Sequence, residues 1–405
     1  MDATGTWDVA VVGAGPAGSA AALAALRVRP GARVLLLDRA DFPRDKACGD
    51  GVAPHVLDVL DSLGAPGLVD DHRPVRRLHL QVAPGPSGRP HERGAAAVAR
   101  DMRRPARVVP RRVLDARIRA AALAAGAEAR TGVVRAVSVG SRDVRLGLSG
   151  GDGLRARVVV GADGAGSAVR RALGLPGPPG RATGLAVRGY GPVRADLADE
   201  QRIVFDGTGP PAYAWSFPVG DGTANVGYGE VLVGGAAPSR RRYLERLEAL
   251  LPGTTDGAGS WRGHHLPLSS DPVRQPDGRV LLAGDSLSLV NPLTGEGLYY
   301  AVLSGACAGS AAVAADGGDP GRAYRTMLRR RLGRHLRHTS ALQRLVRVPG
   351  VLAAGVRAAG DPAVFDDLVE VGLGRGLLSA RVALATGAAL AGSSGTARPP
   401  HSPRP

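Results

Sequence analysis

The stretch Asp8–Asp38, DVAVVGAGPAGSAAALAALRVRPGARVLLLD, predicts a β-strand, a helix and a second strand. An apolar run of strand composition is followed by a glycine-rich turn and by an alanine-rich segment whose helix begins at Pro16. The turn has the spacing G-x-G-x-x-G, formed by Gly13, Gly15 and Gly18. The second apolar run ends in an acid, Asp38, 20 residues after Gly18. A glycine turn between strand and helix, with an acid at this distance, predicts a dinucleotide site.

Each residue of this motif has a physical task. Gly13 makes a tight turn, Gly15 lets the backbone approach a pyrophosphate, and Gly18 lets the helix pack on the strand. Pro16 and Ala17 begin the helix, whose unpaired N–H groups face the phosphates. Asp38 accepts hydrogen bonds from a ribose diol. The alternative is a strand–helix–strand unit whose glycines serve packing only.

Length and composition exclude several classes of protein. The chain has 405 residues, 44% of them apolar, which is enough for two or more lobes around a sizeable core. No uncharged apolar run reaches about 18 residues, so no transmembrane helix is predicted. Asp2 and Asp8 stand where a signal peptide would carry basic residues, and the only cysteines, Cys48 and Cys307, lie far apart. These features predict a cytoplasmic protein without disulfides.

The net charge of +16 has two interpretations. All but one of the 52 basic residues are arginine, a bias typical of a GC-rich genome. The alternative is a basic surface that attracts an acidic electron-donor protein or an anionic lipid surface, with peripheral membrane contact. Aromatic residues make up only 3% of the chain and no recognisable nucleic-acid-binding motif occurs, so nucleic acid is excluded as a partner. No metal site is predicted.

The loop that follows Asp38 and Arg39, ADFPRDKACGDGVAP, carries charged side chains and a thiol between its glycines and prolines. Arg44 suits phosphate oxygens because its guanidinium is a planar fork, whereas Lys46, the only lysine, faces either phosphates or acidic residues. Cys48-Gly49-Asp50-Gly51 predicts a backbone that passes close to a ligand. The alternative for Cys48 is a small packed thiol.

Residues 181–268 differ in character from the rest. Short predicted strands, at 183–190, 201–206, 212–218 and 223–231, precede an amphipathic helix at about 239–251. This order predicts an antiparallel sheet covered by one helix. Within it, Tyr213, Trp215 and Phe217 are two residues apart and share one strand face. Because aromatics are scarce elsewhere, we interpret this face, together with Pro218, as a pocket wall; the alternative is a core face.

Two later segments return to the first lobe. A predicted strand at 157–160 ends in Asp163-Gly164, and another at 279–283 ends in Gly284-Asp285. The segment Asn291–Gly297, NPLTGEG, then precedes a helix at about 298–315. Asp285 can bind a polyol, and the backbone at Gly295–Gly297 can stabilise negative charge on a ring. A single site is thus built from both ends of the chain.

Three blocks together resemble the FAD-contact segments of the para-hydroxybenzoate-hydroxylase-like flavoproteins: residues 13–38, GADGAGSAVR at 161–170 and GDSLSLVNPLTGEG at 284–297. PRDKACGDG around Cys48 and YAWSFP at 213–218 narrow the resemblance to the geranylgeranyl reductase family, which includes archaeal lipid reductases and actinobacterial menaquinone reductases. The resemblance covers Trp7 to about Ala315, and the C-terminal helices more loosely. The family often has Gly-Gly after Cys-x, whereas here the order is Cys48-Gly49-Asp50-Gly51. This departure bears on the identity of the substrate more than on the class of enzyme.

The resemblance implies a role for each matching residue. FAD would be held at the ribose by Asp38, at the ribityl chain by Asp285, and beside the flavin ring by the backbone at 295–297. Cys48 would lie near the flavin, and the aromatic strand would line a prenyl pocket. The full cofactor set is Gly13, Gly15, Pro16, Ala17, Gly18, Asp38, Arg39, Arg44, Cys48, Gly49, Arg111, Asp163, Gly164, Gly284, Asp285, Pro292, Gly295, Glu296 and Gly297.

The fold expected on this basis is α/β plus antiparallel β. A Rossmann-like FAD-binding domain carries an inserted, mainly antiparallel substrate domain, followed by C-terminal helices whose arginines lie on a solvated face or contact a membrane. The FAD-binding domain comprises residues 1–74, 100–180 and 270–318; the substrate domain comprises 75–99 and 181–269; the helices are 319–391 and a disordered tail is 392–405.

The activity implied is the reduction of isolated double bonds in a polyprenyl chain. Reduced flavin gives a hydride to one alkene carbon, and Cys48 or Tyr213 gives a proton to the other. The alternatives are an aromatic hydroxylase of the same fold, a flavin halogenase and a non-catalytic flavin-binding protein. The halogenase is disfavoured because Tyr213 replaces the first tryptophan of its W-x-W motif and the only lysine lies in the cofactor loop.

The sequence leaves two candidates for the electron donor. No second strand–glycine–helix unit occurs, since the glycine-rich stretch 372–376 lacks that context. Either NAD(P)H binds transiently near Asp163, or a reduced acidic carrier protein docks on the basic surface.

Overall fold

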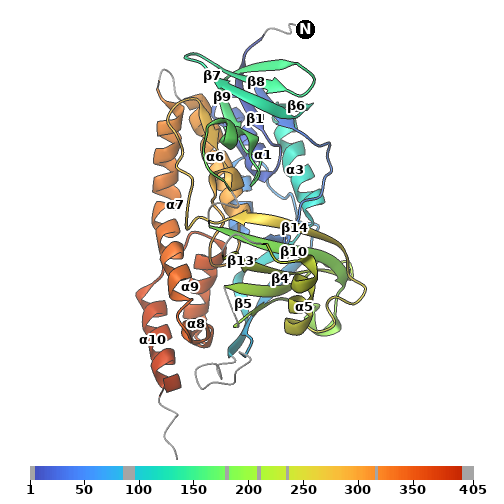
Figure 1. Cartoon of the computed structure of the whole chain (residues 1–405), viewed down its shortest axis with the longest axis vertical. Helices are drawn as coiled ribbons and strands as arrows, with labels where there is room; N and C mark the ends of the chain where they lie inside the picture. Colours follow the sequence, from blue (N-terminus) through green and yellow to red (C-terminus); the bar gives the residue numbers. More distant parts are fainter. Residues whose placement is uncertain are drawn as a thin grey trace, which may run out of the picture.

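The computed structural model describes residues 5–84, 96–177, 182–207, 211–233, 237–314 and 318–394. Two lobes lie one above the other in Figure 1, each built on its own sheet, with the C-terminal helices running along both. The described residues contain no helix that is both long and apolar enough to span a bilayer.

The first sheet has seven strands in the order β6-β2-β1-β9-β8-β7, with β15 paired to β9. Its central strands are parallel and almost fully buried. In β2, for example, the buried residues are Val34, Leu35, Leu36 and Leu37. The strands are β1 Trp7–Val12, β2 Val34–Asp38, β6 Glu128–Thr131, β7 Val134–Val139, β8 Val144–Leu148, β9 Gly153–Gly161 and β15 Val280–Leu282. Because these strands are parallel, the residues that follow β1, β9 and β15 meet at one edge of the sheet.

Helices α1 and α6 join the two ends of the chain on this sheet. α1, Pro16–Val28, packs on α6, Leu298–Ala314, so closely that a Cβ at Gly305 would lie 2.0 Å from the Ala17 carbonyl oxygen. Only glycine permits this approach of two helix backbones. The contact brings the segment before α6 beside the glycine turn before α1, although some 280 residues separate them (297 − 15 = 282).

The second sheet has eight strands in the order β14-β10-β13-β12-β11-β4-β5-β3. All neighbouring pairs are antiparallel except β11 with β4. The strands are β3 Gly51–Val52, β4 Pro74–Val82, β5 Ala96–Val108, β10 Thr183–Pro192, β11 Glu200–Phe205, β12 Ala212–Pro218, β13 Thr223–Val231 and β14 Gly259–Pro267. The expected mainly antiparallel lobe with α5, Arg240–Leu250, on one face is confirmed.

The opposite face of this sheet is covered by the C-terminal helices (Figure 1). Phe365 of α9 packs against Leu78 and Met102, and Val356 of α8 packs against Val82. The expected arginine face on α7 is exposed at Arg329, Arg330, Arg331, Arg334 and Arg337. The helices are α7 Pro320–Leu345, α8 Val351–Ala358, α9 Pro362–Leu373 and α10 Ala380–Ser394; the rest are α2 Pro54–Ser62, α3 Arg111–Ala124, α4 Ala168–Ala172 and the short 3₁₀ turns Ala195–Leu197 and Gly284–Leu287.

Two expected boundaries differ from the structure. β5 continues to Val108 within the second sheet, so residues 100–108 belong there and not with the first sheet. The strand pairs with β4 at 96–101 and 106–107, and its end pairs with β3. Helix α10 continues to Ser394, so the expected tail begins later than residue 392. The remainder of that tail, residues 395–405, and part of the expected segment 75–99, residues 85–95, lie outside the described residues.

Candidate active site

A cavity of about 2040 Å³ lies between the two sheets and the C-terminal helices. Ligand pockets usually measure about 300–1,000 Å³, so this one has room for more than one ligand. Most of the expected cofactor residues line it, although Gly18 and Gly284 do not. One end is lined by the glycine turn and the cofactor loop, and the other end lies between the second sheet and helices α7 to α10.

The glycine turn has the geometry that the sequence predicts. Gly13 has a φ of 99°, and a Cβ there would lie 2.4 Å from the Ala162 carbonyl oxygen, so no other residue fits. No side chain caps the N-terminus of α1, which leaves its first N–H groups for an anion. Asp38 at the end of β2 accepts a hydrogen bond from the Ala14 N–H at 2.8 Å, which holds the acid beside the turn.

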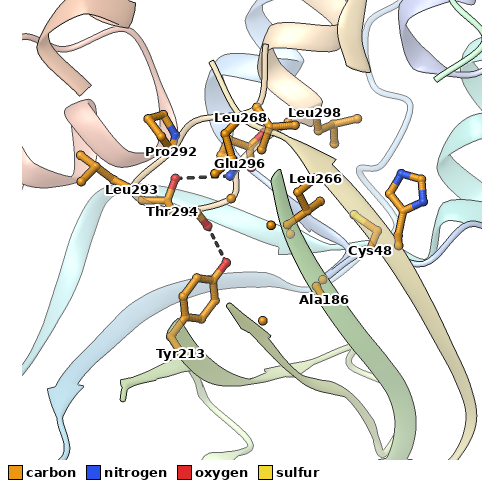
Figure 2. A pocket seen from close by; sticks show the side chains of 18 of the residues that line it. Cys48, Ala186, Tyr213, Leu266, Leu268, Pro292, Leu293, Thr294, Glu296 and Leu298 are labelled. Carbon is orange, nitrogen blue, oxygen red and sulfur yellow. Dashed lines mark hydrogen bonds between the residues drawn. The ribbon is translucent and has the colours of Figure 1, made fainter. Parts of the chain in front are cut away.

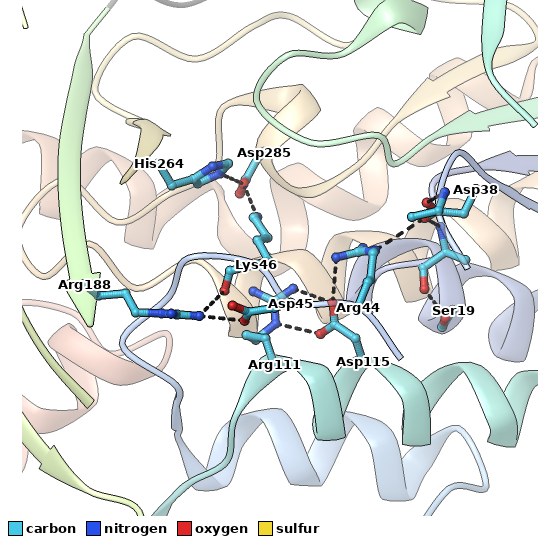
Figure 3. A network of polar contacts seen from close by, with 12 residues as sticks. Ser19, Asp38, Arg44, Asp45, Lys46, Arg111, Asp115, Arg188, His264 and Asp285 are labelled. Carbon is cyan, nitrogen blue, oxygen red and sulfur yellow. Dashed lines mark hydrogen bonds and ion pairs between the residues drawn. The ribbon is translucent and has the colours of Figure 1, made fainter. Parts of the chain in front are cut away.

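Arg44 and Arg111 meet one buried acid, Asp115, which sequence reasoning left without a role (Figure 3). Arg111 donates to Asp115 at 2.6 and 2.9 Å, and the nearest Arg44 nitrogen lies 3.4 Å from that carboxylate. Arg44 also lies 3.9 Å from Asp38, so it spans the two acids at the cavity wall. The i,i+4 spacing of Arg111 and Asp115 in a predicted helix was the available signal. The network fixes two guanidinium groups in the cavity wall, with Arg44 beside Gly15 of the glycine turn.

Asp285 is held by a cation from the cofactor loop. The Lys46 Nζ donates to it at 2.9 Å, and His264 of β14 lies 3.4 Å away (Figure 3). Burial alone would raise the pKa of Asp285, but the Lys46 charge and the His264 contact lower it far below its ordinary value. Asp285 is therefore a permanent carboxylate facing the cavity, suited to accept hydrogen bonds from a polyol. Lys46 faces an acidic residue, which was one of its two expected partners.

The loop before α6 differs in part from expectation. The Gly295 N–H donates to the Asn291 carbonyl at 3.0 Å and the Glu296 N–H to the Thr294 hydroxyl at 3.3 Å, so the loop itself uses both amides. Among the described residues, no hydrogen-bond partner is found for the Gly297 N–H, which leaves it for a ligand. The Glu296 carboxylate accepts the Tyr299 N–H at 2.8 Å, and burial raises its pKa to about 7.

The Asp163 side chain is also occupied within the protein. Its carboxylate accepts the Ala168 N–H at 2.7 Å and the Ser167 hydroxyl at 2.5 Å, and thereby caps the short helix α4. The N-terminus of α4 is therefore occupied by an acid of the chain itself. Asp163 and Gly164 still line the cavity.

The aromatic strand β12 forms one wall of the cavity. Tyr213, Trp215 and Phe217 all line it, with neighbouring ring centroids 5.8 and 6.5 Å apart, whereas Pro218 does not line it. Figure 2 shows the Tyr213 hydroxyl pointing to the Thr294 carbonyl, to which it donates at 2.5 Å. Burial raises the pKa of Tyr213 far above its ordinary value. Tyr213 thus ties the sheet to the loop before α6.

Cys48 lies on the cavity wall beside Asp50, an acid for which the sequence predicts no role. Burial raises the pKa of the Cys48 thiol, and the sulfur accepts the Asp50 N–H at 3.3 Å. The Asp50 side chain meets Tyr190 of β10 and Asn225 of β13. No local sequence pattern predicts these partners, since they lie on strands more than a hundred residues from Asp50 in the chain.

Comparisons with known proteins agree with this geometry. The sequence model of an FAD binding domain matches residues 6–190. The chain is 34% identical to the menaquinone reductase of Mycobacterium tuberculosis over 85% of each chain. It is 32% identical to digeranylgeranylglycerophospholipid reductase 1 of Methanopyrus kandleri over 76% of this chain and 81% of that protein.

The fold has solved counterparts. A geranylgeranyl bacteriochlorophyll reductase-like protein from Thermoplasma acidophilum superposes with a TM-score of 0.69 over 94% of this chain and 95% of its own, at 21% identity. Likeness at this identity concerns the fold alone. The glycine cradle at Gly13, the two fixed guanidiniums and the paired Asp285 fit the groups of FAD, so the residues present and the matched domain agree on the cofactor.

Proposed function

This chain belongs to the geranylgeranyl reductase family of FAD-dependent oxidoreductases, and on that premise we propose that it reduces isolated C=C bonds of a long polyprenyl lipid. The menaquinone reductase similarity favours a prenyl chain attached to a quinone over one attached to a diphosphate. A flavin halogenase or hydroxylase shares the fold, but the relatives at 30% identity and above with broad coverage are named as reductases.

The observation that carries the proposal is the apolar arm of the cavity. It lies between the inner face of the second sheet and the C-terminal helices, where most of the lining side chains are aliphatic or aromatic. An arm of this kind suits a hydrocarbon chain, because it offers apolar surface and few polar partners. Its lining includes Leu78, Leu80, Val82, Ile203, Phe205, Leu342, Val346, Leu352, Val356, Leu368, Val369 and Val382.

We assign the cofactor to the other end of the same cavity. Asp38 would hold the adenosine ribose, Arg44 and the α1 N-terminus the pyrophosphate, and Asp285 the ribityl chain. The Gly297 N–H would face the flavin ring. When bound and reduced, FAD supplies the hydride. The aromatic strand, at Trp215 and Phe217, would position the alkene beside the cofactor and exclude water.

The test is an anaerobic single turnover. The flavoprotein is reduced chemically, mixed with a menaquinone or with geranylgeranyl diphosphate, and followed by flavin absorbance. Reoxidation by the lipid without oxygen, with a product two mass units heavier, is expected. Reoxidation only after oxygen is admitted, with a product that has gained one oxygen atom, would instead establish the hydroxylase.

The arm also supports contact with a lipid surface. Leu345 and Val348, which line the arm, are 46% and 49% exposed, and Leu384 of α10 is 74% exposed. Exposed apolar side chains at the mouth of a lipid site suit insertion between headgroups, and the positive net charge favours anionic lipids. The L345S/V348S variant is expected to lose co-flotation with phosphatidylglycerol vesicles, while R130M, far from the arm, keeps it.

We propose that electrons arrive from NAD(P)H bound transiently or from an acidic carrier protein. The exposed arginine face of α7 supports the carrier, because like-signed charges along one helix attract an acidic surface. Reduction by NADPH alone at a rate matching turnover would favour the nicotinamide. Steady reduction that needs a carrier and weakens steeply with added salt would favour the protein donor.

A further inference from the structure

One acid of the cofactor loop, Asp50, is not among the expected cofactor residues. Asp50 is 1% exposed, lines the cavity and has a φ of 60°, in the left-handed region that residues other than glycine seldom adopt. Its N–H donates to the Cys48 sulfur at 3.3 Å, and its carbonyl accepts the Val109 N–H at 2.9 Å. The surrounding structure therefore imposes a strained backbone to place this carboxyl, as is frequent at functional sites.

The two oxygens of the Asp50 carboxyl have different surroundings. Oδ2 accepts hydrogen bonds from the Tyr190 hydroxyl and, at 2.8 Å, from the Asn225 amide. Oδ1 is buried and has no hydrogen-bond partner among the described residues. A buried carboxylate oxygen without a donor is costly, and a proton on it removes most of that cost. The geometry thus favours a neutral acid that carries its proton on Oδ1.

The neutral and charged states of Asp50 are close in energy near neutral pH. Burial raises the pKa of Asp50 to about 6, against the lowering effect of the Tyr190 and Asn225 hydrogen bonds and of the Arg188 and Arg111 charges. The Cys48 thiol and the Tyr190 hydroxyl are titratable groups beside it, and burial raises the pKa of both. Loss of the proton from Oδ1 leaves an anion that the two donors on Oδ2 already stabilise.

We infer that Asp50 delivers the proton to the alkene carbon opposite the hydride, an inference that rests on the proposed function. The π bond breaks, one carbon gains the hydride, the other forms a C–H bond with the proton from Asp50 Oδ1, and Asp50 becomes a carboxylate. Solvent restores its proton before the next turnover. An unactivated alkene is a very weak base, so an acid fixed within the cavity is required.

The other acids of the cavity are less suited to this task. The pKa values of Cys48 and Tyr213 both lie above their ordinary values, and the Tyr213 hydroxyl already donates a hydrogen bond to the Thr294 carbonyl. Glu296 titrates near neutral pH, but its carboxylate accepts the Tyr299 N–H and caps α6. Glu296 is therefore the rival that an experiment has to separate from Asp50.

The first experiment measures the single-turnover rate of alkene reduction between pH 5 and 8 in wild type, D50N and E296Q. In wild type the rate should be constant well below pH 6 and fall about tenfold per pH unit above it. D50N should lose about 100-fold or more at pH 5 and show no such fall, with FAD affinity changed less than about threefold. D50E, which keeps an acid, should recover part of the rate. The assignment would be overturned by a D50N rate within threefold of wild type. It would also be overturned if E296Q, and not D50N, lost the fall in rate above pH 6.

The second experiment needs neither cofactor nor substrate. It is made in the E296Q background, which removes the other cavity carboxyl that titrates near neutral pH. Infrared spectra of this apoprotein should show a protonated-carboxyl band that disappears as the pH rises through about 6 and is absent from D50N/E296Q. The same band in D50N/E296Q would show that the proton lies elsewhere. A wild-type protein that reduces no prenyl lipid would overturn the proposed function, and the proton-delivery role with it. Activity in wild type together with an unaffected D50N would overturn the role of Asp50 alone.

Discussion

Two acids, the largely buried Asp285 and the fully buried Asp50, lie in the wall of one cavity and are held in opposite ways. Asp285 faces a full positive charge, the Lys46 ammonium, whereas the hydrogen bonds to Asp50 come from the neutral Tyr190 and Asn225 side chains. A charge at contact distance outweighs burial, but two neutral dipoles do not. The pKa of Asp285 accordingly falls far below its ordinary value while that of Asp50 rises to about 6.

The difference separates two chemical tasks within one pocket. A permanent carboxylate at Asp285 suits recognition of a polyol, since it always accepts hydrogen bonds. A carboxyl at Asp50 that gains and loses its proton near neutral pH suits proton transfer. The same residue type thus serves binding at one side and chemistry at the other, and the partner decides which.

The largest expected effect is an inversion of the pH dependence of stability. The folded pKa of Asp50 lies above its ordinary 3.8, so its carboxyl favours the folded state below about pH 4, and this contribution is lost as pH rises through 6. Asn imitates the protonated form. D50N should therefore match wild type near pH 4 and exceed it by about 3 kcal/mol at pH 8, since two pKa units correspond to about 2.7 kcal/mol. Urea unfolding of the apoproteins at each pH measures this.

D285N gives the mirror image of that result. The folded pKa of Asp285 lies below its ordinary value, so its contribution is present above about pH 4 and is lost as the pH falls through the lower folded value. D285N should be less stable than wild type at pH 7 and approach it in acid. Equal pH slopes for D50N and D285N would show that the two acids are not held differently.

Removing the cation at Asp285 tests the other half of the comparison. K46M leaves a buried carboxylate without its charge partner, and such losses cost about 3–5 kcal/mol at fully buried pairs. Because the Lys46 side chain is 26% exposed, we expect about 2 kcal/mol in apoprotein urea unfolding at pH 7. The double variant K46M/D285N should recover most of that loss. R130M breaks an exposed pair with Asp152 and should cost below about 1 kcal/mol. A K46M loss no larger than that of R130M would contradict the account.

The two acids also differ in how far the sequence predicts them. Asp285 follows a buried strand and precedes a glycine-rich helix start, a local pattern that indicates its place in the cofactor site. Its partner Lys46 lies 239 residues away, and only its position in the cofactor loop connected it to the site. The cofactor half of the cavity is therefore predictable from short motifs, apart from the pairings that cross between lobes.

The Asp50 site could not be predicted in the same way. Its loop was recognisable, but its partners depend on the register of β10 against β13, which places Tyr190 opposite Asn225. Register depends on many weak contacts, none of which is visible in a motif. The role of the Asp163 side chain is hidden for a related reason, because the Asp-Gly turn alone does not indicate that this carboxylate caps a helix four or five positions later.

A smaller effect should follow from removing one dipole at Asp50. The Tyr190 hydroxyl lowers the pKa of Asp50 by donating to Oδ2, so Y190F should raise that pKa from about 6 to about 7, equivalent to about 1 kcal/mol for one hydrogen bond. The titration of the protonated-carboxyl infrared band measures it. Y228F is the matched control, because the Tyr228 hydroxyl donates to Asp206 at 3.0 Å in the same sheet. A shift of equal size in Y228F would mean that the change is not local to Asp50.

The smallest effect is expected one contact further out. Trp215 Nε1 donates to the side-chain oxygen Oδ1 of Asn225 at 2.9 Å and so orients the amide that donates to Asp50. W215F keeps most of the ring but loses this donor, which should cost about 1 kcal/mol of stability and raise the pKa of Asp50 by less than Y190F does. Asn225 also donates to the Cys48 carbonyl at 2.8 Å, and that bond keeps its amide in place when the indole is lost. A W215F shift as large as that of Y190F would show that the aromatic wall, and not the two direct donors, sets the proton affinity of Asp50.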